Sequence, residues 1–298
     1  MSAAVSASVD AAGKAADARG VESSARTGAV GAAVPAMLMV DAHAHIWRAD
    51  MPLMANPRHK LDYDFTVEQY LKVLDDHGVH FAVIAAASPY GDYNDYTLDS
   101  ISGNPRLRGT VILQPDVERN TLRAMKAEGI VGVRLPDISM ATLPDLTTFE
   151  NRRTLRRFAD LDWHVHLHLD GARIPQVLPQ LEASGVKIVI DHFARPDPKL
   201  GVNCEGFKQT LRSMEKGRTW VKVSAAYRLG LEAGATYGRE LLKQAGADRL
   251  LWASDCPFAG FEGKFSYQST IDAVNAWVPE GPVRHQIFGG NAMQLYFG

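Results

Sequence analysis

Short apolar runs alternate with amphipathic stretches along most of the chain. The apolar runs predict buried strands at residues 37–40, 79–87, 107–113, 130–135, 163–169, 186–192, 219–224 and 250–254. Between them, apolar residues recur at helical spacing. This spacing predicts helices at residues 66–78, 95–102, 119–128, 149–161, 174–183, 205–216, 237–245, 267–277 and 283–297, the last with a break at Gly289-Gly290-Asn291.

A strand followed by a helix occurs eight times in this pattern. The repetition predicts one parallel TIM (β/α)₈ barrel over residues 37–298. An open, doubly wound sheet would place a glycine-rich phosphate-binding turn after its first strand, and the sequence has no such motif there. Residues 1–36, in which charges interrupt Ala, Ser, Gly and Val, are predicted to be a disordered or non-conforming tail. A transit-like or partner-binding segment is the alternative.

Composition and charge narrow the class of protein. The 298 residues are 46% hydrophobic and 22% charged, as in a soluble globular protein. The formal net charge of -2 gives no reason to expect a nucleic-acid partner or a membrane surface. The two cysteines argue against a disulfide scaffold, and no apolar run approaches the roughly 20 residues of a membrane span. We therefore expect a cytoplasmic monomer or small homo-oligomer that acts on a small molecule.

Candidate site residues fall at the C-terminal ends of the predicted strands, where TIM barrels carry their active sites. The first strand leads into His43 and His45, whose spacing places both imidazoles on one face. Imidazoles held side by side suit a metal ion, or a carbonyl oxygen that must be polarised. Later strand ends contribute Arg134 on the fourth, His166 and His168 on the fifth, His192 on the sixth and Asp255 on the eighth.

Other polar positions within the strands admit structural interpretations. In the fifth run, strict alternation places His164, His166 and His168 on one face. His168 lies nearest the C-terminal end and is expected in the site, whereas the deeper His164 is expected to be a hydrogen-bonded structural residue. His166 is a candidate for either role. We expect Asp191 to bind the barrel rim or to orient another side chain, and Lys222 to extend to the far end of the barrel.

Four motifs together resemble the amidohydrolase superfamily, and in particular its amidohydrolase-2 branch. They are Asp41-Ala42-His43-Ala44-His45, Gly132-Val133-Arg134, Ile190-Asp191-His192 and Trp252-Ala253-Ser254-Asp255-Cys256-Pro257. Within that branch the chain is most similar to the 2-pyrone-4,6-dicarboxylate lactonases, and it also resembles the 4-sulfomuconolactone hydrolases and the sugar lactonases. The resemblance covers residues 37–298, and its motifs specify the fold and the site better than the substrate.

The resemblance implies a role for each matching residue. The implied catalytic group surrounds the substrate carbonyl or a metal-bound water and consists of His43, His45, His192 and Asp255, the last as the base that activates water. The implied or candidate substrate-binding residues are Arg134, Tyr90, Tyr227, Arg228 and His166. Arginine binds a carboxylate or sulfonate through paired hydrogen bonds, so two arginines suit an anionic ring.

The sequence leaves open whether the site holds a metal. A mononuclear zinc site with a position for water would use nitrogen and oxygen ligands from His43, His45, His168 and Asp255. The dicarboxylate lactonases instead work without a metal, and they carry an aromatic hydroxyl where this chain has histidine on the fifth strand. One divalent ion and a metal-free mechanism therefore remain as alternatives. Arg134 stands where a two-metal centre would need a lysine.

These residues predict a carboxylic ester hydrolase that opens a small anionic lactone of the pyrone or muconolactone kind, in aromatic or sugar-acid catabolism. Lactone hydrolysis requires an activated water, stabilisation of an oxyanion and recognition of ring substituents. A zinc-dependent decarboxylase of an unsaturated or aromatic acid and a sugar-acid lactonase are the alternatives within the same branch. A third interpretation is a catalytically silent barrel that only binds a ligand.

Overall fold

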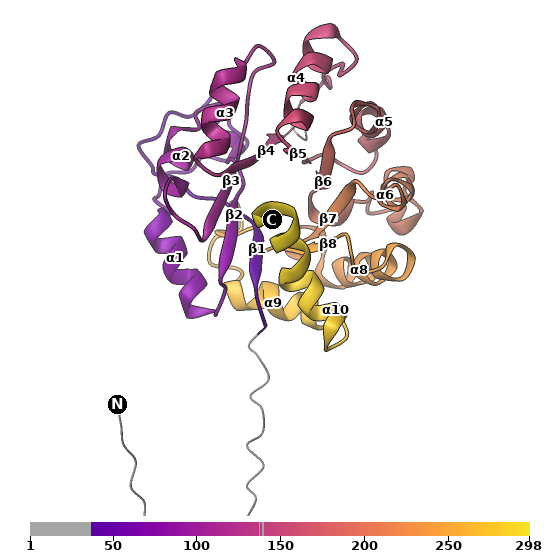
Figure 1. Cartoon of the computed structure of the whole chain (residues 1–298). Helices are drawn as coiled ribbons and strands as arrows, with labels where there is room; N and C mark the ends of the chain where they lie inside the picture. The colour runs from indigo at the N-terminus through magenta and orange to yellow at the C-terminus, as the bar shows by residue number, and fades with distance from the viewer. Residues whose placement is uncertain (1–36, 137, 139) are drawn as a thin grey trace, which may run out of the picture. The chain divides into compact units, whose positions relative to one another are not determined.

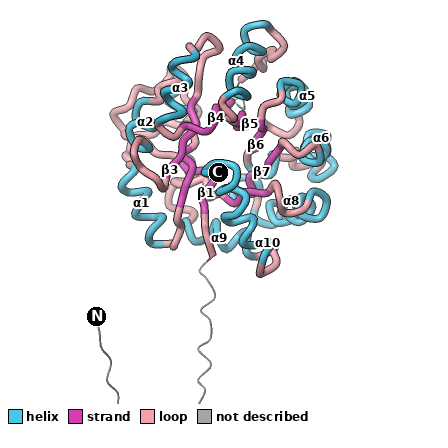
Figure 2. Tube along the Cα trace, viewed as in Figure 1, coloured by secondary structure: helices cyan, strands magenta, loops and turns pink. Residues whose placement is uncertain are grey.

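The computed structural model describes residues 37–298 except 137 and 139, so the predicted tail at 1–36 lies outside the described residues. Eight parallel strands form one sheet in chain order, and helices surround it (Figures 1 and 2). The predicted TIM barrel is therefore confirmed. The strands are β1 (Val40–Ala44), β2 (Phe81–Ile84), β3 (Leu107–Val111), β4 (Ile130–Leu135), β5 (His164–Leu167), β6 (Lys187–Ile190), β7 (Thr219–Val223) and β8 (Leu250–Trp252).

The outer layer packs apolar helix faces against the outward side chains of the strands. Its helices are α1 (Val67–Asp76), α2 (Asp95–Ile101), α3 (Arg119–Ala127), α4 (Phe149–Asp160), α5 (Ile174–Ser184), α6 (Glu205–Glu215), α7 (Ala226–Leu229), α8 (Leu231–Ala245), α9 (Tyr267–Asn275) and α10 (Pro282–His285). No helix in the described part of the chain is both long and apolar enough to cross a membrane. Cys204 and Cys256 are buried free thiols, in agreement with the expected lack of a disulfide framework.

Two helical segments differ from the prediction. Helix was expected only from residue 237, but α7 and the first half of α8 are also helical. Glycines within this segment weaken its helical pattern, and Gly238 is needed there because a Cβ would collide with the Trp277 ring. At the end of the chain the backbone remains helical through Asn291 instead of breaking. Gly289 permits that turn to pack against the Leu38 carbonyl, where a Cβ would not fit.

The last helical turns of the chain, Met293–Phe297, cover the barrel end at which the strands begin, and the C-terminus lies at the centre of the view in Figure 1. The ring of Tyr296 lies 5.2 Å from that of His164, whose Nδ1 donates to the Val131 carbonyl at 2.9 Å. His164 is thus buried and hydrogen-bonded within the barrel. Because side chains fill this end, a ligand can reach the barrel axis only from the end at which the strands finish.

The barrel closes between β1 and the segment that follows β8. Ala44 forms a bridge with Cys256, and the backbone N–H of His45 donates to the Cys256 carbonyl at 2.8 Å. The backbone N–H of Asp255 donates to the His43 carbonyl at 2.9 Å. These bonds place the Asp255 carboxylate directly beside both histidines of the first strand.

Asp41 stabilises this seam, the junction between β1 and the segment after β8, from inside the protein. Its carboxylate is fully buried and accepts hydrogen bonds from the hydroxyls of Tyr70 and Tyr267, each at 2.8 Å, and from the Ser254 hydroxyl. It also accepts the backbone N–H groups of Ser254 at 2.9 Å and His43 at 3.1 Å. The acidic residue of the first motif therefore has a structural role, because it joins β1 and β8 to α1 and α9.

We expect Asp41→Ala to lower the free energy of unfolding by roughly 3 kcal/mol or more, since each buried donor left without a partner costs about 1–3 kcal/mol. Tyr70→Phe removes one of these hydrogen bonds and should cost only about 1 kcal/mol. Denaturant unfolding followed by circular dichroism measures both. Equal costs for the two variants would show that Asp41 does not organise the seam.

Candidate active site

Five of the side chains predicted from strand ends, His45, Arg134, His168, His192 and Asp255, line one cleft at the barrel mouth. The cleft has a volume of about 40 Å³, and its walls include His45, Arg134, His168, His192, Arg228 and Asp255. His43 lies beneath it and is fully buried. Convergence follows from the topology, because all eight parallel strands finish on the same face of the barrel.

The Asp255 carboxylate lies at the centre of this group. Its Oδ1 lies 3.5 Å from Nε2 of His43, 3.6 Å from Nε2 of His45 and 3.8 Å from Nε2 of His192. Burial alone would raise the pKa of the Asp255 carboxyl, but the His192 imidazole and the Arg228 guanidinium outweigh burial and hold that pKa well below its usual range. Asp255 is therefore an ionised acceptor whose one oxygen faces three imidazoles.

The other oxygen of Asp255 is held by residues that sequence reasoning assigned to the substrate. Oδ2 accepts a hydrogen bond from the Tyr227 hydroxyl at 2.5 Å and from Nε of Arg228 at 2.8 Å. Nη2 of Arg228 donates to the Ala259 carbonyl at 3.0 Å. Both side chains come from α7, and in this structure they orient the carboxylate. Arg228 also lines the cleft, whereas Tyr227 is not among its lining residues.

His43 and His45 have their hydrogen-bonding states fixed from outside the cleft. Nδ1 of His43 donates to Oδ1 of Asp191 at 3.1 Å, and Nδ1 of His45 donates to the Ala85 carbonyl at 2.7 Å. Burial lowers the pKa of His43 well below its usual range, so this imidazole is neutral. Because Nδ1 of neutral His43 carries its proton, its Nε2 carries a lone pair, and this atom lies 3.0 Å from Nε2 of His45. Lone pairs at that distance repel unless a cation or a shared proton lies between them.

Three donor atoms in this group meet the geometric requirements of a small cation. Nε2 of His43, Nε2 of His45 and Oδ1 of Asp255 lie 3.0, 3.5 and 3.6 Å from one another. Ligands of a tetrahedral zinc ion, bound at about 2.0–2.1 Å, lie roughly 3.3 Å apart. Each histidine also donates its second ring N–H to an oxygen, which is the usual support of a metal-binding imidazole. The residues fit one divalent ion.

His168, the fourth residue of the predicted ligand set, does not join these donors. Its Nδ1 lies 3.4 Å from Nη2 of Arg134, and its ring centroid lies 5.2 Å from that of His192. Burial and the Arg134 guanidinium lower the pKa of His168 well below its usual range. His192 is held by the Ser224 hydroxyl, which lies 2.8 Å from its Nδ1, and burial lowers its pKa to about 4. Both imidazoles are therefore neutral.

A buried charged layer lies below the cleft. Oδ1 of Asp191 binds Nε2 of His166 as well as Nδ1 of His43, and the pKa of Asp191 is well below its usual range because these neighbours outweigh the effect of burial. Nζ of Lys222 lies 3.6 Å from the same oxygen and 3.2 Å from Nδ1 of His43. The predicted extension of Lys222 to the far end is therefore wrong. Asp191 orients other side chains, which is the second of the two roles expected for it.

This layer also accounts for the burial of His166 and for the charge on Lys222. His166 is fully buried between Asp191 and Lys222 and is not among the cleft-lining residues, so the structure favours its structural interpretation. Burial lowers the pKa of Lys222 to about 8, although Asp191 acts in the opposite direction. A charge in this position is tolerated because an ionised carboxylate lies beside it.

Arg134 and Tyr90 occupy different environments from each other. Nη1 of Arg134 donates to the Ala86 carbonyl at 2.7 Å, and its buried Nε has no partner among the described residues. Tyr90 is buried in a small cluster with Trp47 and Leu61, and it does not line the cleft. Its neighbours in the same turn, Ser88 and Pro89, do.

Sequence reasoning missed Arg58 and His59, which line the cleft from the loop after β1. Burial lowers the pKa of Arg58, and so does the proximity of Arg195, Arg228 and Arg134. The basic run 58–60, in the stretch between the first predicted strand and the first predicted helix, was the available signal. Several guanidinium groups thus gather around one cleft, an environment that favours an anion.

The fold and the site define a TIM-barrel enzyme with a histidine–aspartate centre. The amidohydrolase family profile matches residues 40–298. The chain therefore belongs to the amidohydrolase family, which confirms the resemblance inferred from the four motifs and the predicted class of enzyme.

Three similar proteins illustrate this relationship. A 4-sulfomuconolactone hydrolase from Hydrogenophaga intermedia is 27% identical over 242 residues, which are 78% of this chain and 80% of that protein. The structure of a probable 2-pyrone-4,6-dicarboxylic acid hydrolase from Acinetobacter baumannii, with citric acid bound, has a TM-score of 0.83 at 30% identity and covers 88% of this chain and 100% of that one. An amidohydrolase from Burkholderia multivorans with bound zinc shares the fold, with a TM-score of 0.74 at 17% identity over 87% of this chain and 99% of that one.

Proposed function

We propose that the protein hydrolyses a small anionic lactone, with Asp255 as the base that activates water. The observation that carries this proposal is the arrangement of three imidazoles around one oxygen of Asp255, in a cleft whose walls also hold Arg58, Arg134 and Arg228. The names of the similar hydrolases support a lactone that bears carboxylate or sulfonate groups.

In the proposed reaction a water molecule hydrogen-bonded to Oδ1 of Asp255 attacks the lactone carbonyl carbon. Asp255 accepts one proton of the water as the new carbon–oxygen bond forms. Collapse of the tetrahedral intermediate breaks the ring carbon–oxygen bond, and the departing oxygen receives the proton from Asp255. The product contains a new carboxyl group, which releases one proton at neutral pH.

Neutral His192 is placed to stabilise the oxyanion. The Ser224 hydroxyl fixes its Nδ1 side, and its Nε2 points toward the cleft and Asp255. An Nε2–H in this position can donate to the carbonyl oxygen as negative charge develops there, which is the largest single contribution in many acyl-transfer enzymes. A preformed donor of this kind requires an imidazole that is not already charged, and the low pKa of His192 provides one.

We also propose that His43, His45 and Asp255 hold one divalent ion, with zinc as the best match to two imidazoles and a carboxylate. The low pKa of Asp255 makes it a weak base toward an ordinary water molecule. A divalent ion held by these residues would supply the missing driving force, because it would lower the pKa of bound water to roughly 7. The protein contributes the orientation of the ligands, through Asp191 and the Ala85 carbonyl.

A panel of lactones tests the proposed function. We expect turnover of pyrone carboxylates or muconolactones, with stoichiometric acid release in a pH-stat and no carbon dioxide. Carbon dioxide release from an aromatic or unsaturated acid, without ring opening of any lactone, would establish the decarboxylase alternative. Turnover confined to uncharged sugar lactones would rule out the anionic substrate.

A further inference from the structure

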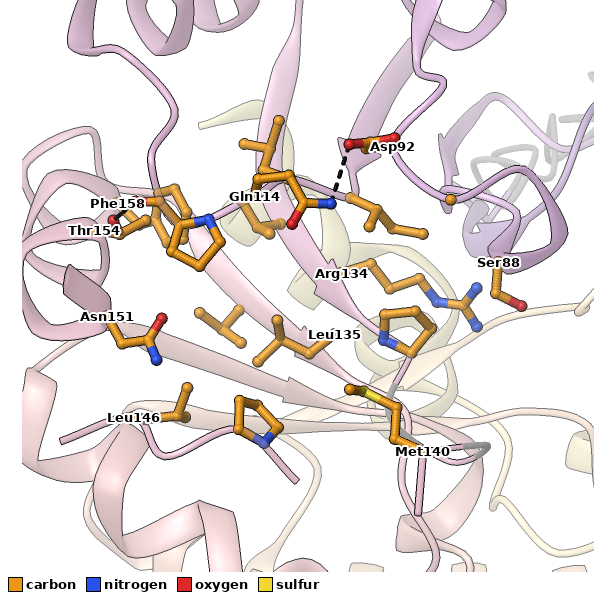
Figure 3. Close-up of a pocket in the computed structure, with 18 of the residues that line it drawn as sticks. Ser88, Asp92, Gln114, Arg134, Leu135, Met140, Leu146, Asn151, Thr154 and Phe158 are labelled. Carbon is orange, nitrogen blue, oxygen red and sulfur yellow. Dashed lines mark hydrogen bonds between the residues drawn. The ribbon is translucent and has the colours of Figure 1, made fainter. Parts of the chain in front are cut away.

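A second and much larger cavity adjoins the catalytic cleft. Its volume is about 730 Å³, and it shares Arg58, Ser88 and Arg134 with the cleft. It begins at the C-terminal ends of β3 and β4 and extends along the inner face of α4 (Figure 3). The position of the shared residues makes the cavity a continuation of the active site.

The cavity changes from charged to apolar with distance from the cleft. Charged side chains, Arg58, Arg134 and Asp92, lie where the loops after β1 and β2 meet the end of β4. The remaining wall is dominated by apolar side chains that include Ile112, Val133, Leu135, Leu155, Phe158 and Val165. In Figure 3, Leu135 lies near the centre of the view and Phe158 at the upper left.

Three polar side chains of the apolar part of this wall, Gln114, Thr154 and Asn151, already have hydrogen-bond partners. Nε2 of Gln114 donates to Asp92 at 3.1 Å, and the Thr154 hydroxyl donates to the Pro115 carbonyl at 2.5 Å. Nδ2 of Asn151 donates to the Asp145 carbonyl at 2.7 Å. Water in the cavity would therefore find few hydrogen bonds, and an apolar group would be bound in preference to it.

The two volumes limit how a substrate can be arranged. The cleft, at about 40 Å³, has room for no more than about three water-sized groups, since each needs roughly 10–15 Å³. The scissile ester group alone fills it, so the rest of the ring must extend past Arg134. A single six-membered ring such as benzene occupies a cavity of roughly 150 Å³. A simple monocyclic lactone would leave most of the larger cavity empty.

We propose that the substrate carries an apolar arm, alkyl or aryl, that extends from its anionic lactone ring into this cavity along α4. This inference rests on the proposed function, and it specifies a class of substrate with two different ends. The anionic ring lies among the arginines, and the arm lies between α4 and the outer face of β4 and β5. The apolar arm determines specificity, because the charged end is common to many small acids.

Two lactones that share one carboxylated ring and differ only by hydrogen or n-butyl at the position distal to the ester test this proposal. Each methylene that enters an apolar site strengthens binding about fourfold. The butyl lactone should therefore have a kcat/KM up to roughly 250-fold higher than that of the unsubstituted lactone. The matching cyclic ethers, which have no carbonyl, provide probes of binding alone by calorimetry, and the same gain is expected in their affinities.

A pair of variants on α4 locates the arm. Asn151→Phe fills the cavity from its rim and keeps the helix cap, because the bond from its backbone N–H to Thr148 persists. Arg152→Phe is the matched control, since the next residue is exposed and does not line the cavity. We expect Asn151→Phe to abolish most of the gain in kcat/KM that the butyl group provides, and Arg152→Phe to retain that gain.

The outcomes separate this inference from the proposed function. If both lactones are opened with equal kcat/KM, or if the two variants retain the same butyl gain, the proposal of an apolar arm is wrong. The proposed lactone hydrolysis is not affected by that result. If neither lactone is opened but the butyl ether binds more tightly and Asn151→Phe removes that advantage, the cavity is the predicted subsite and the lactonase is wrong. Equal affinities of the two ethers would overturn the inference independently of turnover.

Discussion

Asp255→Asn is expected to reduce kcat by about three orders of magnitude, because a general base contributes roughly 10²–10⁴ to the rate and an amide cannot accept the proton of the attacking water. Asparagine has the shape of aspartate, and its oxygen can still accept from Tyr227 and Arg228, so the cleft should keep its form. Affinity for an unreactive anionic analogue should change much less than turnover. Steady-state kinetics and calorimetry measure the two quantities.

Asp170→Asn is the matched control for this variant. Asp170 follows β5, is partly exposed and pairs with Arg195 at 3.1 Å. Because a partly exposed ion pair contributes little to stability, we expect turnover within about threefold of the parent. An Asp255→Asn protein with unchanged turnover would exclude Asp255 from the reaction and favour a barrel that only binds its ligand. Recovery of turnover on addition of zinc would assign Asp255 as a metal ligand rather than as the base.

The barrel and the location of its site could be predicted because both follow from periodicity. Repeated strand and helix patterns specify the parallel barrel, and the barrel places every strand end on one face. His45, His192 and Asp255 could therefore be assigned to one cleft, with His43 beside them, although the three motifs are far apart in sequence. No contact between them had to be known in advance.

Depth within the barrel could not be predicted in the same way. Alternation along a strand indicates which side chains face the barrel axis, but it gives neither their height nor their neighbours on other strands. In the observed register His166 is paired with Arg134 and with Val189, which places its imidazole in the layer of Asp191. Because both side chains contact Asp191 in that layer, His166 lies below the cleft and Lys222 stays inside the barrel.

The contacts made by loops and by α7 also could not be predicted from the periodicity of the sequence. Arg58 reaches the cleft from an irregular loop that has no periodicity to place it. Arg228 could be recognised as a site residue, but its hydrogen bond to Asp255 depends on how α7 begins after β7. Ala225 precedes that helix with φ of 53°, a left-handed conformation that an apolar pattern does not reveal.

The second large effect concerns the metal, for which the structure and the sequence suggest different ligand sets. Protein purified without added metal is expected to contain close to one equivalent of zinc per chain, measured by elemental analysis. Removal of the ion by a chelator should reduce turnover by about a hundredfold or more, since the ion supplies the acidity of the attacking water, and zinc should restore it. Turnover unaffected by complete removal of metal would establish the metal-free mechanism, with His43 and His45 bound to the substrate carbonyl.

His45→Ala and His168→Ala distinguish the two ligand sets. Nε2 of His45 lies 3.0 Å from Nε2 of His43 and 3.6 Å from Asp255, so its loss removes one of three ligands and should weaken zinc binding by about a hundredfold or more. His168 lies against Arg134, outside the group of donors, and its replacement should leave the zinc content unchanged. Zinc titration of the two apo variants measures the difference without reference to turnover. Equal loss of zinc from both variants would return His168 to the ligand set, and retention of zinc by both would remove His45 from it.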